Sequence, residues 1–410
     1  MFETLAERTL ALAQLARRAN PDGGFEPLLD DMLQPILERC LRHGIRIVGN
    51  FGAANPPGAA RRILAMAREL GVRAPKIAVV HGDDLSGAAH RESLRRELGA
   101  AIDEIAVVSA NAYLGAEPIA GALAAGAEIV VCGRVADPSL AVGPLMAHFG
   151  WNANEWESLG PATMAGHLLE CGAQVTGGYF ADPGVKDVDG LHDVGFPIAQ
   201  VERTGRCVIG KAAGTGGLVS ERTVKEQLLY EVHDPAAYVT PDVVADISAA
   251  EVHETGRDQV VLEGVRGHPR PDRLKVTVCH EGGWLAEGEI SYAGPGAEAR
   301  ARLAADVLRR RLDGLDVRVD LIGSVSVFAD DRGRMLAHSP TRKLRDVRLR
   351  VAARHGDKAQ AERLAREVTA LYTCGPAGGG GVRTALRPRL DTLSCFVPRT
   401  AIDAGWEMVA

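Results

Sequence analysis

The feature that most constrains this chain is an alternation of short apolar segments with longer helical segments between residues 45 and 149. Strands that alternate with helices in this way form βα units on a parallel sheet. The strands read as continuous apolar runs, which is typical of a sheet covered on both faces. The predicted pairs of strand and helix are 45–48 with 57–70, 76–80 with 85–98, 105–108 with 117–125, and 128–132 with 138–149. The sequence therefore predicts an α/β fold with an N-terminal, Rossmann-like parallel sheet.

The pattern changes after residue 151. Residues 172–217 are rich in Gly and Pro, and the later strands are amphipathic rather than continuously apolar. Mixed strands interspersed with long helices are typical of an α+β domain. The strands are expected at 207–210, 260–265, 274–279, 288–292, 316–321, 347–352 and 392–397, with helices at 298–312 and 358–372. We therefore predict a Rossmann-like α/β domain over residues 1–200 and an α+β domain with Gly-rich loops over residues 201–410.

Composition excludes several classes of function. Lys and Arg number 47 against 53 Asp and Glu, a net charge of −6, whereas nucleic-acid binders need a basic face. No uncharged apolar stretch approaches the roughly 18 residues of a membrane span. The N-terminus is charged and unlike a signal peptide. The seven cysteines include no C-x-x-C pair, so we expect a reduced, cytoplasmic protein. From the charge and the apolar pattern we expect no nucleic-acid and no membrane partner.

Polar side chains recur where the four predicted strands end. In open α/β sheets, ligands bind at the carboxyl ends of the strands. An alternative is that Asn and Asp merely cap the helices that follow, which fits Asp84 and Asp137 better than it fits the other residues. The candidate substrate-binding residues at these ends are Asn50, Asn55, Asp83, Asn111, Tyr113, Arg134 and Asp137. We predict a ligand site at this edge of the sheet.

A second candidate lies in the Gly-flanked segment 166–178. His167 and Glu170 are three residues apart, which places them on one face of a helix. A carboxylate beside an imidazole is suited to general acid–base catalysis. Cys171 and Gln174 follow, as a candidate nucleophile and a candidate substrate contact. The alternative is a satisfied core histidine, a capping glutamate and a small buried cysteine.

A third candidate is the segment Lys211–Gly217, which we name the Lys211 loop. Its backbone N–H groups, Lys211 and the Thr215 hydroxyl are groups that cradle a carboxylate or phosphate. A plain tight turn explains it equally well, because the Lys precedes the glycines, unlike in G-x-x-x-x-G-K-[ST]. The chain contains no G-x-G-x-x-G after a strand, no G-x-S-x-G and no H-E-x-x-H. We therefore predict no bound metal and no cofactor.

Several longer stretches together resemble one family. The chain is similar to the acyclic terpene utilisation (AtuA-like) family from about residue 2 to at least residue 290. The stretches that carry the resemblance are 50–56, 81–85, 109–115, 133–137, 148–151, 165–174, 195–199, 214–217 and 227–231. The resemblance implies a role in the catabolism of citronellol- and geraniol-type terpenes, near acyl-CoA carboxylases and β-oxidation enzymes.

Two departures from the family accompany the resemblance. Family members usually begin with a strand and a Gly-rich loop before the helix that corresponds to residues 2–15. The first strand of the family's sheet is therefore expected to be missing here, either because the start is misassigned or truncated or because the sheet lacks that strand. Phe51 and Ala54 stand where relatives commonly have smaller or different residues, which predicts a different substrate shape.

Two functional hypotheses follow. The first is a lyase or hydratase that acts on a branched acyl or hydroxy-acid substrate, with a CoA thioester as one possible form. His167 and Glu170 would move the protons, while Asn50, Asn111, Arg134 and the Lys211 loop would hold the acyl oxygen or a carboxylate. The second is a non-catalytic acyl-CoA-binding or accessory subunit of a terpene or branched acyl-CoA carboxylase pathway. In both hypotheses the ligand is a small acyl molecule and the protein is expected to form a homo-oligomer.

Overall fold

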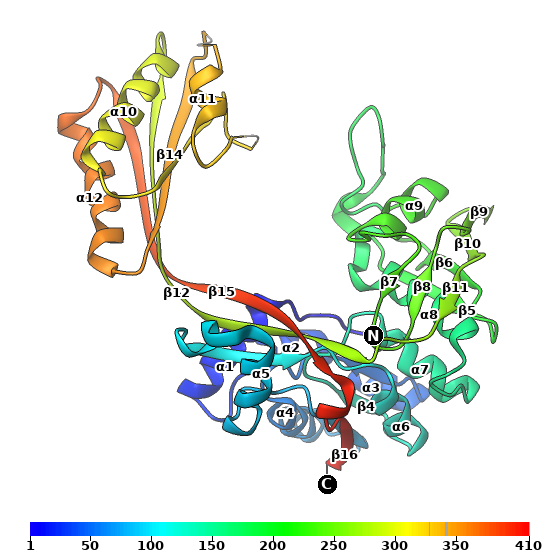
Figure 1. Ribbon diagram of the computed structural model, residues 1–410. Helices are drawn as coiled ribbons and strands as arrows, with labels where there is room; N and C mark the ends of the chain where they lie inside the picture. Colours follow the sequence, from blue (N-terminus) through cyan, green and yellow to red (C-terminus); the bar gives the residue numbers. More distant parts are fainter. Residues whose placement is uncertain (328, 341–342, 410) are drawn as a thin grey trace. The chain divides into compact units, whose positions relative to one another are not determined.

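The computed structural model describes residues 1–327, 329–340 and 343–409, in which the chain is a mixed α/β protein with several sheets (Figure 1). It divides into two compact units. Unit 1 comprises Met1–Cys279 and Thr392–Ala410, and unit 2 comprises His280–Asp391. The long strands β12 (Arg273–Ala293) and β15 (Gly379–Pro398) contribute residues to both units. The expected domain boundary at residue 200 lies inside unit 1.

The first sheet of unit 1 has the strand order β1-β4-β2-β16. Strands β1, β4 and β2 are parallel, and the C-terminal β16 pairs with β2 in the antiparallel sense. Their bounds are β1 (Ile47–Gly49), β2 (Ile77–His81), β4 (Ile129–Val131) and β16 (Gly405–Val409). Three of the four predicted N-terminal strands therefore share one parallel sheet.

The Rossmann-like N-terminal sheet is not confirmed, because β3 (Val107–Ala112) leaves that sheet and pairs with β12. The backbone N–H of Tyr113, just after β3, donates to the carbonyl oxygen of Lys275 on β12 at 2.9 Å. This pairing depends on a segment more than a hundred residues away. The local apolar pattern of residues 105–108 predicts a strand but contains no information about that partner.

Both faces of the parallel sheet are buried, as its continuous apolar strands predict. On one face Ile77 and Val79 pack against Ile63 and Met66 of α4 (Pro56–Glu69). On the other face lie α6 and α7, through residues such as Ile119 and Leu140. The remaining helices of this half of unit 1 are α1 (Glu7–Ala19), α2 (Leu29–Leu33), α3 (Leu37–His43), α5 (Arg91–Leu98), α6 (Glu117–Ala124) and α7 (Ser139–Phe149).

The second half of unit 1 is built around α8 (Trp156–Glu170). Met164 and Leu168 of α8 pack against the antiparallel sheet β5-β6-β10-β9 and against α9 (Glu221–Leu229). A small sheet of order β11-β8-β7 completes this half. The strands are β5 (Pro197–Val201), β6 (Cys207–Lys211), β7 (Tyr238–Val239), β8 (Val244–Asp246), β9 (Glu251–Gly256), β10 (Gln259–Glu263) and β11 (Arg266–His268).

Unit 2 is a sheet covered by helices, with its own core. The alternating apolar residues Leu349 and Val351 of β14 pack against Leu308 of α10 and Leu364 of α12. The elements are α10 (Ala297–Arg311), β13 (Val317–Ile322), α11 (Arg334–His338), β14 (Asp346–His355) and α12 (Lys358–Cys374), beside parts of β12 and β15.

Candidate functional site

The C-terminal turn of α8 holds an imidazole and a carboxylate in direct contact. Nδ1 of His167 lies 3.0 Å from Oε1 of Glu170, as their three-residue spacing predicts. Nε2 of His167 lies 3.0 Å from the carbonyl oxygen of Gln227, and the Tyr238 hydroxyl is 3.4 Å from Nδ1. His167 is completely buried. These contacts fix the orientation of the imidazole ring, and the ring in turn positions the carboxyl group of Glu170.

Glu170 is the group that this support presents. Its side chain is 8% exposed, and burial raises the pKa of its carboxyl above the ordinary value despite the opposing effect of His167. Oε2 of Glu170 is buried without a hydrogen-bond partner among the residues that the structure describes. A carboxyl group with a raised pKa and one free oxygen has the features of a general acid–base group.

Glu170 lines a pocket of about 560 Å³, which we name the carboxylate pocket because of its acidic lining. Two cations, Arg134 and Lys275, also line it, together with Tyr113 and Cys171. The acidic residues of its wall are Glu3, Glu7, Asp137, Glu170 and Glu231. The pocket therefore combines general acid–base groups with the candidate residues Tyr113, Arg134 and Asp137.

Arg134 and Lys275 lie against the same aromatic ring. The guanidinium carbon of Arg134 is 4.2 Å from the ring centroid of Tyr113, and the Lys275 ammonium is 4.6 Å from it. The Tyr113 hydroxyl donates to Glu7, whose carboxylate lies 3.5 Å from the Lys275 ammonium. The side chain of Arg134 is 2% exposed and donates to Asp137 and to the carbonyl oxygen of Leu5. Both cations are thus already paired.

Asp137 is the second carboxyl group with an altered pKa in this pocket. Burial raises its pKa to about 6, against the opposing effect of Arg134. The negative charges of Glu3 and Glu7 add to the rise. Asp137 does not act as a helix-capping residue here, since its carboxylate pairs with Arg134.

Asn50 does not line the carboxylate pocket but holds in place the N-terminal segment that does. The N-terminal segment runs beside β1, where Phe2 forms a parallel bridge with Gly49. The buried Asn50 amide oxygen accepts from the backbone N–H of Thr4 at 2.8 Å, and its nitrogen donates to Glu3 at 3.0 Å. These bonds hold residues 3–9 over the pocket.

Asn55, Asp83 and Asn111 also make contacts within the fold. The Asn55 side chain caps α4, accepting from the N–H of Gly58 at 3.1 Å. Asp83 Oδ2 accepts from the Asn111 amide at 3.0 Å and from the backbone N–H of Arg134 at 2.8 Å. Burial raises the pKa of Asp83 to about 6. These three residues do not line the carboxylate pocket.

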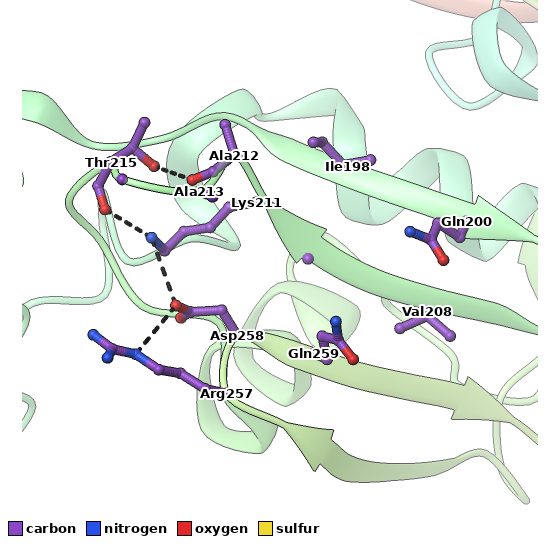
Figure 2. Close-up of a pocket in the computed structure, with 12 residues that line it drawn as sticks. Ile198, Gln200, Val208, Lys211, Ala212, Ala213, Thr215, Arg257, Asp258 and Gln259 are labelled. Atoms are coloured by element: carbon purple, nitrogen blue, oxygen red, sulfur yellow. Dashed lines mark hydrogen bonds and ion pairs between the residues drawn. The ribbon is translucent and has the colours of Figure 1, made fainter.

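The Lys211 loop lines a different pocket, of about 600 Å³, beside β5 and β6 (Figure 2). The ammonium of Lys211 donates to the carbonyl oxygen of Thr215 at 2.8 Å and lies 3.6 Å from Asp258. The Thr215 hydroxyl donates to the carbonyl oxygen of Ala212 at 2.7 Å. Figure 2 shows these bonds closing the loop on itself. The sequence-predicted groups Lys211 and Thr215 therefore do not meet Arg134 and Glu170 in one pocket.

With the geometry in place, the family can be stated. The family model of the acyclic terpene utilisation family protein AtuA matches residues 1–408, nearly the whole chain. This chain belongs to the AtuA family. Neither the curated proteins nor the solved structures gave a match to it.

Cys171 and Gln174 follow α8 in this AtuA family chain. Cys171 is exposed as a residue and lines the carboxylate pocket. The partial burial of its thiol, together with the charge of Glu170, raises the pKa of that thiol to about 11. The thiol form dominates at neutral pH, which does not favour a nucleophilic role. Gln174 lies in the short 3₁₀ turn Gly172–Gln174, outside the residues that line the carboxylate pocket.

Beside the pocket-lining Glu3 and Glu231, four residues that the sequence did not indicate build the site. Glu7 and Lys275 pair across the pocket, Gln227 and Tyr238 hold His167, and they come from four separate elements. Only Gln227 had a signal, because it begins one of the stretches that resemble the family. Among the described residues, no group of three or more His, Cys, Asp or Glu is arranged to hold a metal ion, and no helix is both long and apolar enough to cross a membrane.

Proposed function

We propose that this AtuA family chain is a lyase or hydratase that catalyses acid–base chemistry on a branched acyl or hydroxyacyl substrate. The observation that carries the proposal is Glu170. Its buried carboxyl group is oriented by His167 through one oxygen and has no partner for the other. A second carboxyl group with a raised pKa, that of Asp137, lines the same pocket. Two such groups are what the removal of one proton and the delivery of another require.

The proposed step is the elimination of water from a 3-hydroxyacyl group. The Glu170 carboxylate removes the proton next to the acyl carbonyl, and the electron pair of that C–H bond forms the carbon–carbon double bond. The C–O bond to the hydroxyl group breaks as Asp137, in its acid form, gives its proton to the departing oxygen, which leaves as water. Glu170 then returns its proton to solvent and Asp137 takes one up. Hydration is the reverse of this sequence.

A neighbouring pocket of about 550 Å³ supports a branched hydrocarbon substrate. It shares Tyr113, Asp137 and Lys275 with the carboxylate pocket. The rest of its wall is largely apolar, including Pro138, Val239, Pro241, Pro271, Leu274 and Phe396. In this proposal the alkyl branch lies in the apolar pocket while the reacting atoms lie beside Glu170.

His167 acts as a positioning residue in this scheme. It is completely buried and does not line the carboxylate pocket, whereas Glu170 does. Its contact with Oε1 leaves Oε2 as the oxygen for the substrate proton. This differs from the expectation that both residues would carry protons to the substrate.

The test uses a panel of 3-hydroxyacyl and enoyl compounds, as thioesters and as free acids, in deuterated water enriched in heavy oxygen. Mass spectrometry measures the label taken up with wild type, with Glu170→Gln and with Glu157→Gln. Glu157 is a matched control, because it lies on the same helix and is exposed. We expect Glu170→Gln to lower label uptake at least a hundredfold, a typical loss for a general acid–base group, and Glu157→Gln to leave it unchanged.

Two outcomes would contradict the proposal. Wild-type label uptake by Glu170→Gln would remove the acid–base role of that residue. Retention of a thioester by wild type without any label uptake would instead support the accessory, acyl-binding subunit.

A further inference from the structure

We infer that the carboxylate pocket admits the reacting end of its substrate as an uncharged group, such as a thioester, and disfavours a free carboxylate. This inference rests on the proposed function for the identity of the site and names the chemical class of its substrate. It follows from the charges around the pocket and from the partners that those charges already have.

The balance of charge in the pocket wall is negative. Five carboxyl groups line it against two cations, Arg134 and Lys275. Even with Asp137 and Glu170 protonated, three carboxylates face two cations. A negative field of this kind repels an anion, and the repulsion is stronger in a partly buried pocket than in water.

Both cations already have partners within the fold, and the one guanidinium nitrogen of Arg134 that has none among the described residues, Nε, is buried. Arg134 donates to Asp137 and to the carbonyl oxygen of Leu5, and Lys275 lies within 3.5 Å of both Glu7 and the Tyr113 hydroxyl. An incoming carboxylate would have to displace one of these partners and leave it unpaired. The exchange is unfavourable at Arg134, because leaving a buried charge without its partner is costly. At Lys275 the cost is smaller, because Lys275 and Glu7 are 42% and 39% exposed.

The free oxygen of Glu170 favours the same class of substrate. Oε2 is buried without a partner in the described chain, and Glu170 lines the pocket. In its ionised form this oxygen repels a carboxylate but not an uncharged carbonyl group. A thioester therefore brings the proton next to its carbonyl group to this oxygen without that repulsion.

Glu231 adds negative charge at an exposed point of the wall. It is a non-glycine residue with φ of 58°, in the left-handed region that side chains other than Asn and Asp rarely adopt. Asp258, beside the Lys211 loop, has the same backbone conformation, so the charge and position of Glu231 carry the argument rather than its backbone. We assign to Glu231 a part in excluding anions from the pocket.

The experiment uses the pocket's own thiol as a reporter. Cys171 is exposed and lines the carboxylate pocket, whereas Cys374 is exposed on unit 2 and interacts with the cation Arg311. Native protein at pH 9 is alkylated in parallel with iodoacetamide, which is neutral, and with iodoacetate, an anion of similar size. Peptide mass spectrometry gives the rate at each cysteine. The ratio of neutral to anionic rate is compared between Cys171 and Cys374 in the same sample.

We expect this ratio to be at least fivefold higher at Cys171 than at Cys374. Glu231→Gln should lower the ratio at Cys171 and leave that at Cys374 unchanged, while Glu157→Gln should change neither. Equal ratios at the two cysteines would overturn the inference. So would a lack of labelling at Cys171 by both reagents after an incubation long enough to allow for its raised thiol pKa, because the pocket would then be closed to small molecules.

The inference and the proposed function fail separately. Label uptake from free acids at the same rate as from thioesters would refute the exclusion of carboxylates while leaving the acid–base role intact. Discrimination against iodoacetate without label uptake from any compound would refute the enzyme while leaving the charge selectivity intact.

Discussion

In the carboxylate pocket, Glu170 keeps one oxygen without a partner, and the carboxyl groups of Glu170 and Asp137 both have a raised pKa. At the Lys211 loop, the Lys211 ammonium and the Thr215 hydroxyl both donate hydrogen bonds to carbonyl groups of the loop itself. Both regions belong to unit 1, and both combine cationic with anionic side chains. What separates them is whether bonding capacity remains for a ligand.

The difference gives a criterion for function. A polar group whose hydrogen bonds are made within the fold stabilises the fold, whereas a buried group left without a partner costs free energy and persists where it serves a ligand or a reaction. On this criterion we propose that Glu170 takes part in the reaction and that Lys211 and Thr215 stabilise the fold. Four substitutions test this division, beginning with the one of largest effect.

His167→Leu should have the largest effect, because it removes the support of the reactive group. Glu170 and the carbonyl oxygen of Gln227 would both lose a buried partner. We expect a loss of about 3–5 kcal/mol in the free energy of unfolding, as for a broken buried pair, and at least a hundredfold loss of turnover. Denaturant titration measures the free energy of unfolding, and the labelling assay measures turnover. Unchanged turnover in a folded variant would contradict the positioning role.

The sequence predicts the elements of the site better than their assembly. The three-residue spacing of His167 and Glu170 predicts their contact because a helix is a local structure. The carboxylate pocket also needs residues 3–9, Lys275 and Glu231, which are brought together by pairing between distant segments. Local patterns do not encode such pairing, and for the same reason the sequence did not reveal that β3 joins β12.

The strand ends illustrate the same limit at the level of single residues. Asn50, Asn111 and Arg134 were all expected to hold a ligand, but only Arg134 lines the carboxylate pocket. An asparagine can cap a helix, hold a neighbouring segment in place or bind a ligand, and the residue type alone does not distinguish these roles. Its role depends on the atoms within hydrogen-bond distance, which only the folded chain defines.

Asp83→Asn asks whether a raised pKa alone marks a reactive carboxyl group. Burial raises the pKa of Asp83 from 3.8 to about 6, yet Asp83 lines neither pocket. An acid whose pKa is higher in the folded state holds more protons when folded, so its contribution to stability falls as pH rises from about 4 to about 6.

At about 1.4 kcal/mol for each unit of pKa, wild type should lose roughly 3 kcal/mol relative to Asp83→Asn over that range. The asparagine keeps an oxygen for Asn111 and for the N–H of Arg134, since both bonds reach the same atom of Asp83. Denaturant titrations from pH 4 to pH 7 measure the difference. Turnover should match that of wild type, and a large loss would place Asp83 in the reaction.

Lys211→Met should affect stability and leave the chemistry alone. The Lys211 side chain is 6% exposed. Its loss leaves the carbonyl oxygen of Thr215 without this donor and removes the ion pair with Asp258. We expect the free energy of unfolding to fall by about 1–2 kcal/mol, as for a charged hydrogen bond. Label uptake should stay within twofold of wild type. A hundredfold loss of uptake would return the Lys211 loop to the active site.

Thr215→Val is the smallest and most specific change. Valine keeps the shape of threonine and removes only the hydroxyl group that donates to the carbonyl oxygen of Ala212. Since one neutral hydrogen bond is lost at a partly exposed site, we expect a fall of about 0.5–1 kcal/mol in the free energy of unfolding. Thermal and denaturant unfolding measure it, beside turnover. A change in turnover or substrate preference without this small loss would mean that the hydroxyl faces a ligand, and the distinction between satisfied and unsatisfied groups would then fail at the loop where it is drawn.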